Sequence, residues 1–278
     1  MITDDLLNEY SSKCLDPYHN MDYSALADEE DFIQETVNGL THPPIHTHTG
    51  MIETRTRSVH QSPKVTFEIP TGDTVQRELA DLLYLVTSNG PRREETRRGM
   101  LTQAKFAKAP PSWNIDLYQY HLIKEFSDFV VTSPRTCEEF SFESIPNSFA
   151  NFGLASRFRD PIYLTGSRME EAVSNFDYRT DSATFNPDRY RTESPPTVYE
   201  YSQSILKRLI RGTYGTKITS GSEIDRLIDH LNNIVDGSYS TAPSPCTDGG
   251  FDEERQFDDS PGFTIVDITI TMEEPGIE

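Results

Sequence analysis

In the stretch FTIVDITITM, residues 263–272, apolar and polar side chains alternate from Val266 to Met272. The apolar members are Val266, Ile268, Ile270 and Met272, and the polar members between them are Asp267, Thr269 and Thr271. A period of two is typical of a β-strand with one buried face. We therefore predict a strand here. Its simplest partner is KVTFEI, residues 64–69, which alternates in the same way.

The core of this stretch, IVDIT at residues 265–269, resembles the SUMO-interacting motif, a short aliphatic run with an embedded acid and flanking acids or phosphorylatable Ser. The matching positions are Ile265, Val266, Asp267 and Ile268, with Asp258, Asp259 and Ser260 upstream and Glu273 and Glu274 downstream. The resemblance implies that the strand is added to the edge of SUMO. Two alternatives therefore stay open: a strand of the protein's own sheet, or a strand offered to a partner.

Acidic residues are concentrated at the two ends of the chain. Of the formal net charge of −20, residues 1–40 carry −9 and residues 245–278 carry −9, which leaves −2 between them. This distribution predicts a central domain, residues 51–243, between an acidic N-terminal arm, residues 1–50, and an acidic C-terminal tail, residues 244–278. Acidic arms either solubilise a protein or bind basic partners.

Helical periodicity occurs at residues 24–39, 74–88, 198–212 and 220–237. In the last segment Ser220 and Glu223 have capping-box spacing, and Gly237 occupies a C-cap position. Apolar or alternating runs predict strands at 64–69, 114–120, 129–131, 139–143 and 162–164, whereas 41–63 and 175–197 read as a linker and a loop. We predict an α+β fold: a single central domain with a mixed or antiparallel sheet and a C-terminal helix pair, flanked by acidic, partly disordered arms.

The sequence contains no motif that names a reaction. The segment HPPIHTHTG carries His42, His46 and His48, but no neighbouring Cys or acid completes a metal site, so none is predicted. Nucleophile-elbow, phosphate-loop, dinucleotide and zinc-protease motifs do not occur. We therefore nominate no catalytic residue and no cofactor, and an enzyme ranks third among the hypotheses.

A basic patch lies in PRREETRRG, where Arg92, Arg93, Arg97 and Arg98 could contact phosphates. The interleaved Glu94 and Glu95 cancel half of that charge. Nucleic-acid binding is therefore less favoured than docking of an acidic arm, from the same chain or from a neighbouring copy.

Five Ser-Pro dipeptides predict proline-directed phosphorylation, with turn formation as the alternative. Their serines are Ser62, Ser133, Ser194, Ser244 and Ser260. Cys14, Cys137 and Cys246 fit neither a disulfide framework nor a zinc pattern. The sequence also shows no signal peptide and no apolar run long enough for a membrane span. A cytoplasmic or nuclear protein is expected.

These features predict a non-enzymatic protein–protein interaction protein, an adaptor or regulator whose acidic arms bind SUMO or a basic protein. The alternative is a structural or accessory protein of an RNA virus that self-associates through Arg clusters and acidic arms. The strand–turn–helix arrangement expected at 64–88, with the acidic ends, is similar to such proteins of negative-strand RNA viruses. More than one of those families fits it equally.

Overall fold

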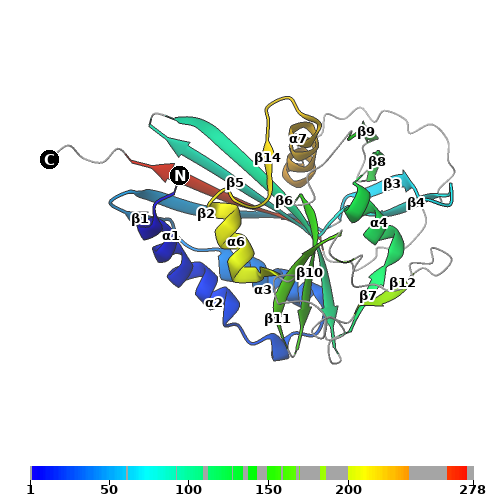
Figure 1. Ribbon diagram of the computed structural model, residues 1–278, viewed down its shortest axis with the longest axis horizontal. Coiled ribbons are helices and arrows are strands. Elements are labelled where there is room, and N and C mark those ends of the chain that lie inside the picture. Colours follow the sequence, from blue (N-terminus) through cyan, green and yellow to red (C-terminus); the bar gives the residue numbers. More distant parts are fainter. Residues whose placement is uncertain are drawn as a thin grey trace.

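The computed structural model is a mixed α+β fold in which sheets dominate (Figure 1). It describes residues 2–60, 62–91, 93–108, 112–126, 128–133, 137–142, 149–157, 159–166, 169, 182–185, 200–237 and 262–273. Within these ranges the largest sheet has nine strands. In spatial order its path is β1 (Ile45–Thr47), β2 (Gly50–Val59), β15 (Phe263–Met272), β5 (Leu82–Gly90), β6 (Arg93–Ala107), β10 (Ala150–Ser156), β11 (Arg159–Thr165) and β13 (Glu200–Tyr201), and β14 (Thr216–Ile218) also pairs with β6.

Two smaller sheets lie beside the large one in Figure 1. The first contains, in order, β4 (Thr74–Glu78), β3 (Lys64–Glu68), β8 (Phe129–Ser133) and β9 (Glu138–Phe140). The second pairs β12 (Ser182–Phe185) with β7 (Trp113–Asp116). The strands expected at 64–69, 129–131 and 162–164 are confirmed, and β9 covers part of the one expected at 139–143.

The C-terminal strand β15 lies inside the large sheet. It pairs along its whole length with β2 in antiparallel register and with β5 in parallel register from Thr264 to Thr271. Its apolar side chains are buried on both faces, because Phe263 and Ile265 face one core and Val266, Ile268 and Ile270 face the other. The predicted strand is confirmed, but its expected pairing with 64–69 is wrong, since β3 belongs to the four-stranded sheet.

This position corrects the partner-strand alternative. Strand addition to SUMO needs a free backbone edge, and both edges of residues 265–268 are hydrogen-bonded inside the sheet. Ile265 and Val266 are fully buried, and Ile268 is nearly so. The described part of the acidic C-terminal tail is therefore a central strand of the domain.

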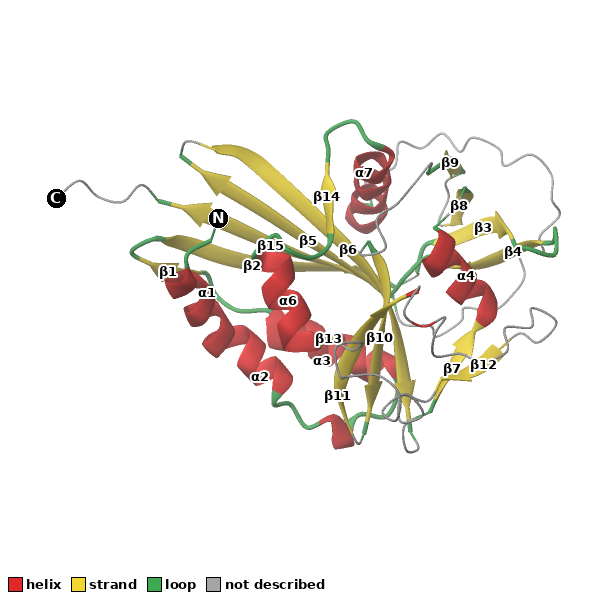
Figure 2. Cartoon of the chain, in the orientation of Figure 1, coloured by secondary structure: helices red, strands yellow, loops and turns green. Residues whose placement is uncertain are grey.

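Helices cover both faces of the large sheet (Figure 2). One face carries α1 (Asp4–Tyr10), a π-helical turn (Ser11–Leu15), α2 (Asp16–His19), a 3-10 turn (Tyr23–Ala25), α3 (Glu29–Leu40) and α6 (Ser202–Ile210). The opposite face carries α7 (Glu223–Asp236), and α4 (Leu117–Glu125) packs in the same core as the four-stranded sheet. None of the described helices is long and apolar enough to cross a membrane.

The N-terminal 40 residues form a packed layer rather than a separate arm. Their apolar stripe, which includes Leu6, Leu15 and Phe32, is buried against the sheet. Several of their acids stabilise helix starts. Asp28 accepts a hydrogen bond from the amide of Asp31, whose carboxylate in turn accepts one from Ala27 N, so α3 begins at Glu29 and not near Ser24. The helix expected at 24–39 is thus confirmed with a later start.

The expected C-terminal helix pair is not observed. The helix α6 buries Ile205, Leu206 and Leu209 in the core with the N-terminal layer, whereas α7 buries Leu227, Ile228 and Leu231 in the core with the four-stranded sheet. The two helices therefore lie on opposite faces of the large sheet. The caps of α7 are close to the prediction: Ser222 caps its start, and Gly237 ends it with a left-handed φ of 63°.

Three other predictions are wrong. Residues 74–88 are not a helix but contribute to β4 and β5, because Leu82–Val86 are buried on both faces of a sheet. The expected linker at 41–63 contains β1 and β2. Residues 114–120, expected to be one strand, change from β7 to α4 at Asp116, which caps the helix by accepting a hydrogen bond from Gln119 N.

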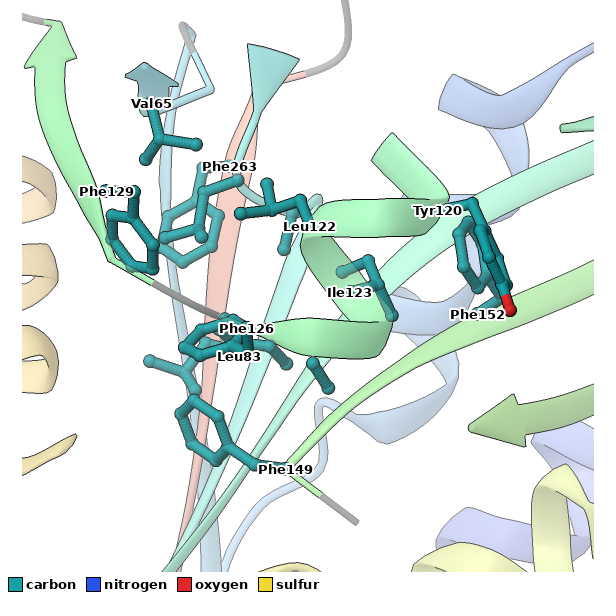
Figure 3. Close-up of a cluster of buried hydrophobic side chains, with 14 of the residues drawn as sticks. Val65, Leu83, Tyr120, Leu122, Ile123, Phe126, Phe129, Phe149, Phe152 and Phe263 are labelled. Carbon is teal, nitrogen blue, oxygen red and sulfur yellow. The ribbon is translucent and has the colours of Figure 1, made fainter. Parts of the chain in front are cut away.

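The core between the large sheet and the four-stranded sheet is rich in aromatic side chains (Figure 3). Phe126 lies at its centre, 5.4 Å from the ring of Phe129 and 5.3 Å from that of Phe149 in edge-to-face geometry. It also ends α4 in the left-handed region, with φ 41°. This conformation is costly for a residue other than glycine, and burial of the ring offsets the cost.

Candidate active site

A buried carboxyl group lies in the large sheet at the point where β6 extends beyond the start of β5. Asp81 directly precedes β5, and its side chain is almost completely buried. Its main chain joins two neighbouring strands, because Asp81 N donates to Thr102 O (3.1 Å) and Thr264 N donates to Asp81 O (2.9 Å). Next to Asp81, β2 ends at Val59, β15 begins at Phe263 and β5 begins at Leu82. The neighbouring strand β6 continues to Ala107. Gln103–Ala107 therefore extend beyond the start of β5.

Hydrogen bonds fix one oxygen of this carboxyl group. Gln103 Nε2 donates to Asp81 Oδ2 (2.5 Å), and Ala104 N donates to the same oxygen (2.7 Å). The other oxygen, Oδ1, has no hydrogen-bond partner among the described residues. Asp81 Oδ1 is not among the fully buried side-chain atoms that lack a partner, so this oxygen keeps some contact with solvent.

Two further charged groups complete the cluster. Lys105 follows Gln103 by two residues on β6, so both side chains leave the same face of the strand. Lys105 Nζ is 3.1 Å from Glu29 Oε2, and the Lys105 side chain is 15% exposed. Glu29 is held in the first turn of α3, and its side chain is 34% exposed. The exposed fractions of Glu29 and Lys105 give the cluster its route to solvent.

The electrostatics of the cluster are strongly perturbed. Burial raises the pKa of Asp81 to about 8, because the nearby Lys105 ammonium opposes this only in part and Glu29 and Glu78 reinforce it. Burial lowers the pKa of Lys105, but Glu29 and Asp81 outweigh it, so the net shift is upward and Lys105 keeps its proton. Perturbed groups that gather around one point are typical of functional sites.

The sequence contained a signal for this cluster that motif matching misses. Asp81 directly precedes the buried run LLYLV, and Gln103 and Lys105 interrupt the mostly apolar run MLTQAKFA. A polar side chain inside a buried strand is costly unless it is paired or used. The pairing of β5 with β6, which places Asp81 opposite Gln103, supplies what the linear sequence does not show.

The predicted basic patch is divided among structural contacts. Arg97 Nη1 donates to Asp225 Oδ1 on α7 (2.8 Å), and Arg98 Nη1 donates to Gly215 O (2.9 Å). Arg92 lies outside the described residues, and only the backbone of Arg93 is described. The expected contact between an Arg and the acidic N-terminal segment is observed elsewhere, between Arg211 Nη2 and Asp4 Oδ1 (2.8 Å).

Asp267 of the SUMO-like segment has a structural partner. Arg57 Nη2 lies 2.7 Å from Asp267 Oδ2, and Arg57 Nη1 lies 2.8 Å from Asp236 Oδ1 at the end of α7. Arg57 Nη2 also donates to Asn232 Oδ1 (2.7 Å). The acid that resembles a motif position therefore helps to hold α7 on the sheet.

The predicted phosphorylation sites are only partly described. Ser62 is 2% exposed in the folded chain, and its phosphorylation stays a prediction. Ser133 ends β8, and nothing further is described of its side chain; Ser194, Ser244 and Ser260 lie outside the described residues. Phosphorylation at those four serines stays a prediction.

The structure also shows the contacts of two of the predicted histidines and the state of two of the cysteines. Within the described ranges, no group of three or more His, Cys, Asp or Glu side chains is arranged to hold a metal ion, and His42 contacts Pro43 O while His48 lies 3.5 Å from Asp5. Cys14 is a buried free thiol, and Cys137 is disulfide-bonded. The three cysteines were not expected to form a disulfide framework, and Cys137 departs from that expectation, whereas the cytoplasmic or nuclear location stays a prediction.

Comparison of the chain with protein-family models, curated proteins and solved structures finds no match.

Proposed function

We propose that this protein is a hydrolase that cleaves phosphodiester bonds at the Asp81 cluster with the help of a divalent cation. The observation that carries the proposal is the buried Asp81 carboxyl group, one oxygen of which is held by Gln103 and Ala104, together with the Glu29–Lys105 ion pair, whose charges act on the Asp81 pKa.

The donors present suit a hard cation such as Mg²⁺. This ion prefers oxygen ligands and is usually bound by one or two carboxylates, with water and substrate phosphate filling the other positions. Asp81 and Glu29 supply two carboxyl groups, and the charge of Glu29 contributes to the raised pKa of Asp81. Among the described residues no group of three or more ligating side chains could hold a metal ion, so the described part of the chain does not form a complete metal site by itself. When bound, such an ion polarises the phosphoryl oxygen and lowers the pKa of water.

The remaining groups have complementary roles in the reaction. Water attacks phosphorus and loses a proton, the bond between phosphorus and the leaving ester oxygen breaks, and the leaving oxygen takes up a proton from solvent, to which the base later returns its own. Glu29, the accessible carboxylate, is the group that accepts the proton of the attacking water. Lys105 keeps its proton and stabilises the negative charge that develops on the phosphoryl oxygens.

Two basic residues next to the cluster favour a polyanionic substrate. The strands β6 and β10 are parallel and paired up to Ala107 and Ser156. Lys108 and Arg157 directly follow these paired ends and are both exposed. Arg157 Nε donates to Leu26 O (2.9 Å), and the two residues bring positive charge to this end of β6 and β10 on a chain whose net charge is −20. A polynucleotide is therefore the first substrate to test, because its phosphates bind basic side chains.

The interaction-protein hypothesis and its viral alternative stay as hypotheses from the sequence. They do not account for the Asp81 cluster, whereas the proposed hydrolase does. A protein of this fold could also have partners, so the two kinds of function are not exclusive.

The proposal is tested by incubating supercoiled plasmid and labelled single-stranded oligonucleotides with the full chain and Mg²⁺, Mn²⁺ or a chelator. We expect cleavage with the cations only, and a loss of at least about 100-fold in Asp81→Asn and Lys105→Met. Arg55→Gln, which removes a charge from the exposed face of β2, is the matched control and should retain activity. Equal cleavage by wild type and Asp81→Asn would assign the activity to a contaminant.

A further inference from the structure

The chain has two long stretches that contain no acid, and both are basic. Residues 96–115 and 201–222 are its longest runs without Asp or Glu, and each carries four Lys or Arg, in a chain with 45 acids. The structure brings the two runs together, because β14 pairs with Arg97–Gly99 of β6 in antiparallel register. The second run also contains α6 and the loop that joins it to β14.

Two cations lie opposite each other in this strand pair. Lys217 is the direct partner of Arg98 in the register, so both side chains leave the same face of the sheet. Arg98 Nη1 donates to the main-chain oxygen of Gly215 (2.9 Å), and no carboxylate among the described residues pairs with it. Lys217 is exposed and has no ion-pair partner within the described ranges. Like charges directly opposite each other destabilise a sheet.

The end of α6 brings further positive charge to the same place. A Cβ atom at Gly212 would lie 3.3 Å from Arg98 Nε, so the chain next to Arg211 passes close to the Arg98 side chain. Arg211 is exposed, and its ion pair with Asp4 is weak because the Asp4 side chain is 83% exposed. We call the following four residues the basic surface: Arg98, Arg208, Arg211 and Lys217.

The stability of the fold explains only part of this charge. Cations near the C-terminus of a helix interact favourably with the helix dipole, which accounts for Lys207 and Arg208 in the last turn of α6. The dipole does not account for Arg98 and Lys217, which lie on paired strands. A local arrangement that costs stability without a structural return is expected at functional sites.

We infer that the basic surface binds the phosphate backbone of a polynucleotide. A polynucleotide carries one charge per nucleotide, so a single strand can contact cations of β6, β14 and α6 together. A second copy of this chain is the rival partner, but acids of its N-terminal layer are partly committed, Glu29 to Lys105 and Asp28 to the cap of α3. The inference goes beyond the proposed function, because the basic surface shares no residue with the Asp81 cluster.

The test measures binding of a labelled single-stranded oligonucleotide to the full chain by fluorescence anisotropy, in a chelator and over a series of salt concentrations. Wild type is compared with a double variant, Arg211→Gln with Lys217→Gln, in which both altered side chains are exposed. The matched control combines Lys13→Gln with Arg55→Gln, which removes two exposed cations outside the basic surface. Urea unfolding and sedimentation velocity report the stability and the oligomeric state of each protein.

We expect the control to bind like wild type and the double variant to bind about 10-fold or more weakly, with the slope of log affinity against log salt reduced by about 1.5. If the double variant does not fold, Lys217→Gln alone decides, by about half that change in slope.

Absence of binding by wild type, or an equal loss in the control, would overturn the inference. A wild-type dimer that dissociates in the double variant, without oligonucleotide binding, would assign the basic surface to a second copy and would also overturn it. Binding that depends on these residues, without cleavage when Mg²⁺ is added, would refute the proposed function and leave the inference supported.

Discussion

The burial of Asp81 predicts that the stability of the protein depends on pH, and that Asp81→Asn abolishes this dependence. The pKa of this carboxyl group rises from its ordinary value of 3.8 to about 8 in the folded chain, chiefly because of burial. A carboxyl group with a raised folded-state pKa binds its proton more tightly when the protein is folded. Its contribution to stability is therefore complete below pH 3.8 and is lost as the pH rises toward 8.

The magnitude follows from the size of this shift. Each pH unit between the two pKa values lowers the free energy of unfolding by about 1.4 kcal/mol, so the loss at pH 7 is on the order of 4 kcal/mol. Asp81→Asn keeps an oxygen that can accept from Gln103 and Ala104 but does not titrate. The variant should therefore gain stability relative to wild type steadily from pH 4 to 8, with no further gain above pH 8.

The assay is urea unfolding of both proteins between pH 4 and 9 in the presence of a metal chelator. Glu30→Gln, which removes one exposed carboxylate from α3, controls for the change in net charge. Parallel profiles for wild type and Asp81→Asn would refute the reasoning, because they would mean that Asp81 is ionised in the folded protein to the same extent as in the unfolded chain. A variant that becomes more stable while cleavage is lost would separate function from folding at this residue.

Three further results are expected. Val266→Ala removes two methyl groups from the fully buried centre of β15 and should lower the free energy of unfolding by about 2–3 kcal/mol in urea titrations; a change below about 0.5 kcal/mol would contradict a central position for this strand. Arg57→Ala removes the contacts to Asp236, Asn232 and Asp267 and should cost about 1–2 kcal/mol, with hydrogen exchange increasing most in α7. Burial raises the pKa of the Cys14 thiol to about 11, so mass-mapped alkylation should leave Cys14 unmodified until the protein unfolds, and rapid labelling of the native chain would contradict its burial.

The sequence correctly predicted those elements whose hydrophobic periodicity fits only one type of secondary structure. The stripe of α7 and the alternation of β15 each fit one structure, and both were found where expected. The helix predicted for residues 74–88 is wrong, because apolar residues recur there at helical spacing without forming a helix. These residues are Val75, Leu79, Leu82 and Val86. Leu82–Val86 are instead a continuous apolar run that fills a strand buried on both faces. A short run of this kind cannot be assigned by periodicity alone.

The partners of each element depended on contacts that are distant in the chain. β15 alternates like a strand that is exposed on one side, yet the N-terminal layer and the core around α7 bury most of both its faces. The N-terminal segment was predicted to be an arm because of its net charge of −9. Its apolar residues Leu6, Leu15 and Phe32 nevertheless pack in the core. The Asp81 cluster assembles residues from 29 to 119, so sequence spacing carried no direct sign of it.

Cleavage of a phosphodiester substrate by purified protein tests the central claim most directly. Labelled DNA and RNA strands are incubated with wild type, Asp81→Asn and Arg55→Gln in Mn²⁺, and the products are separated by length. The account predicts shortened products with wild type and Arg55→Gln, and at least about a 100-fold lower rate with Asp81→Asn. Intact strands with folded wild type that binds Mn²⁺, or equal rates for all three proteins, would contradict it.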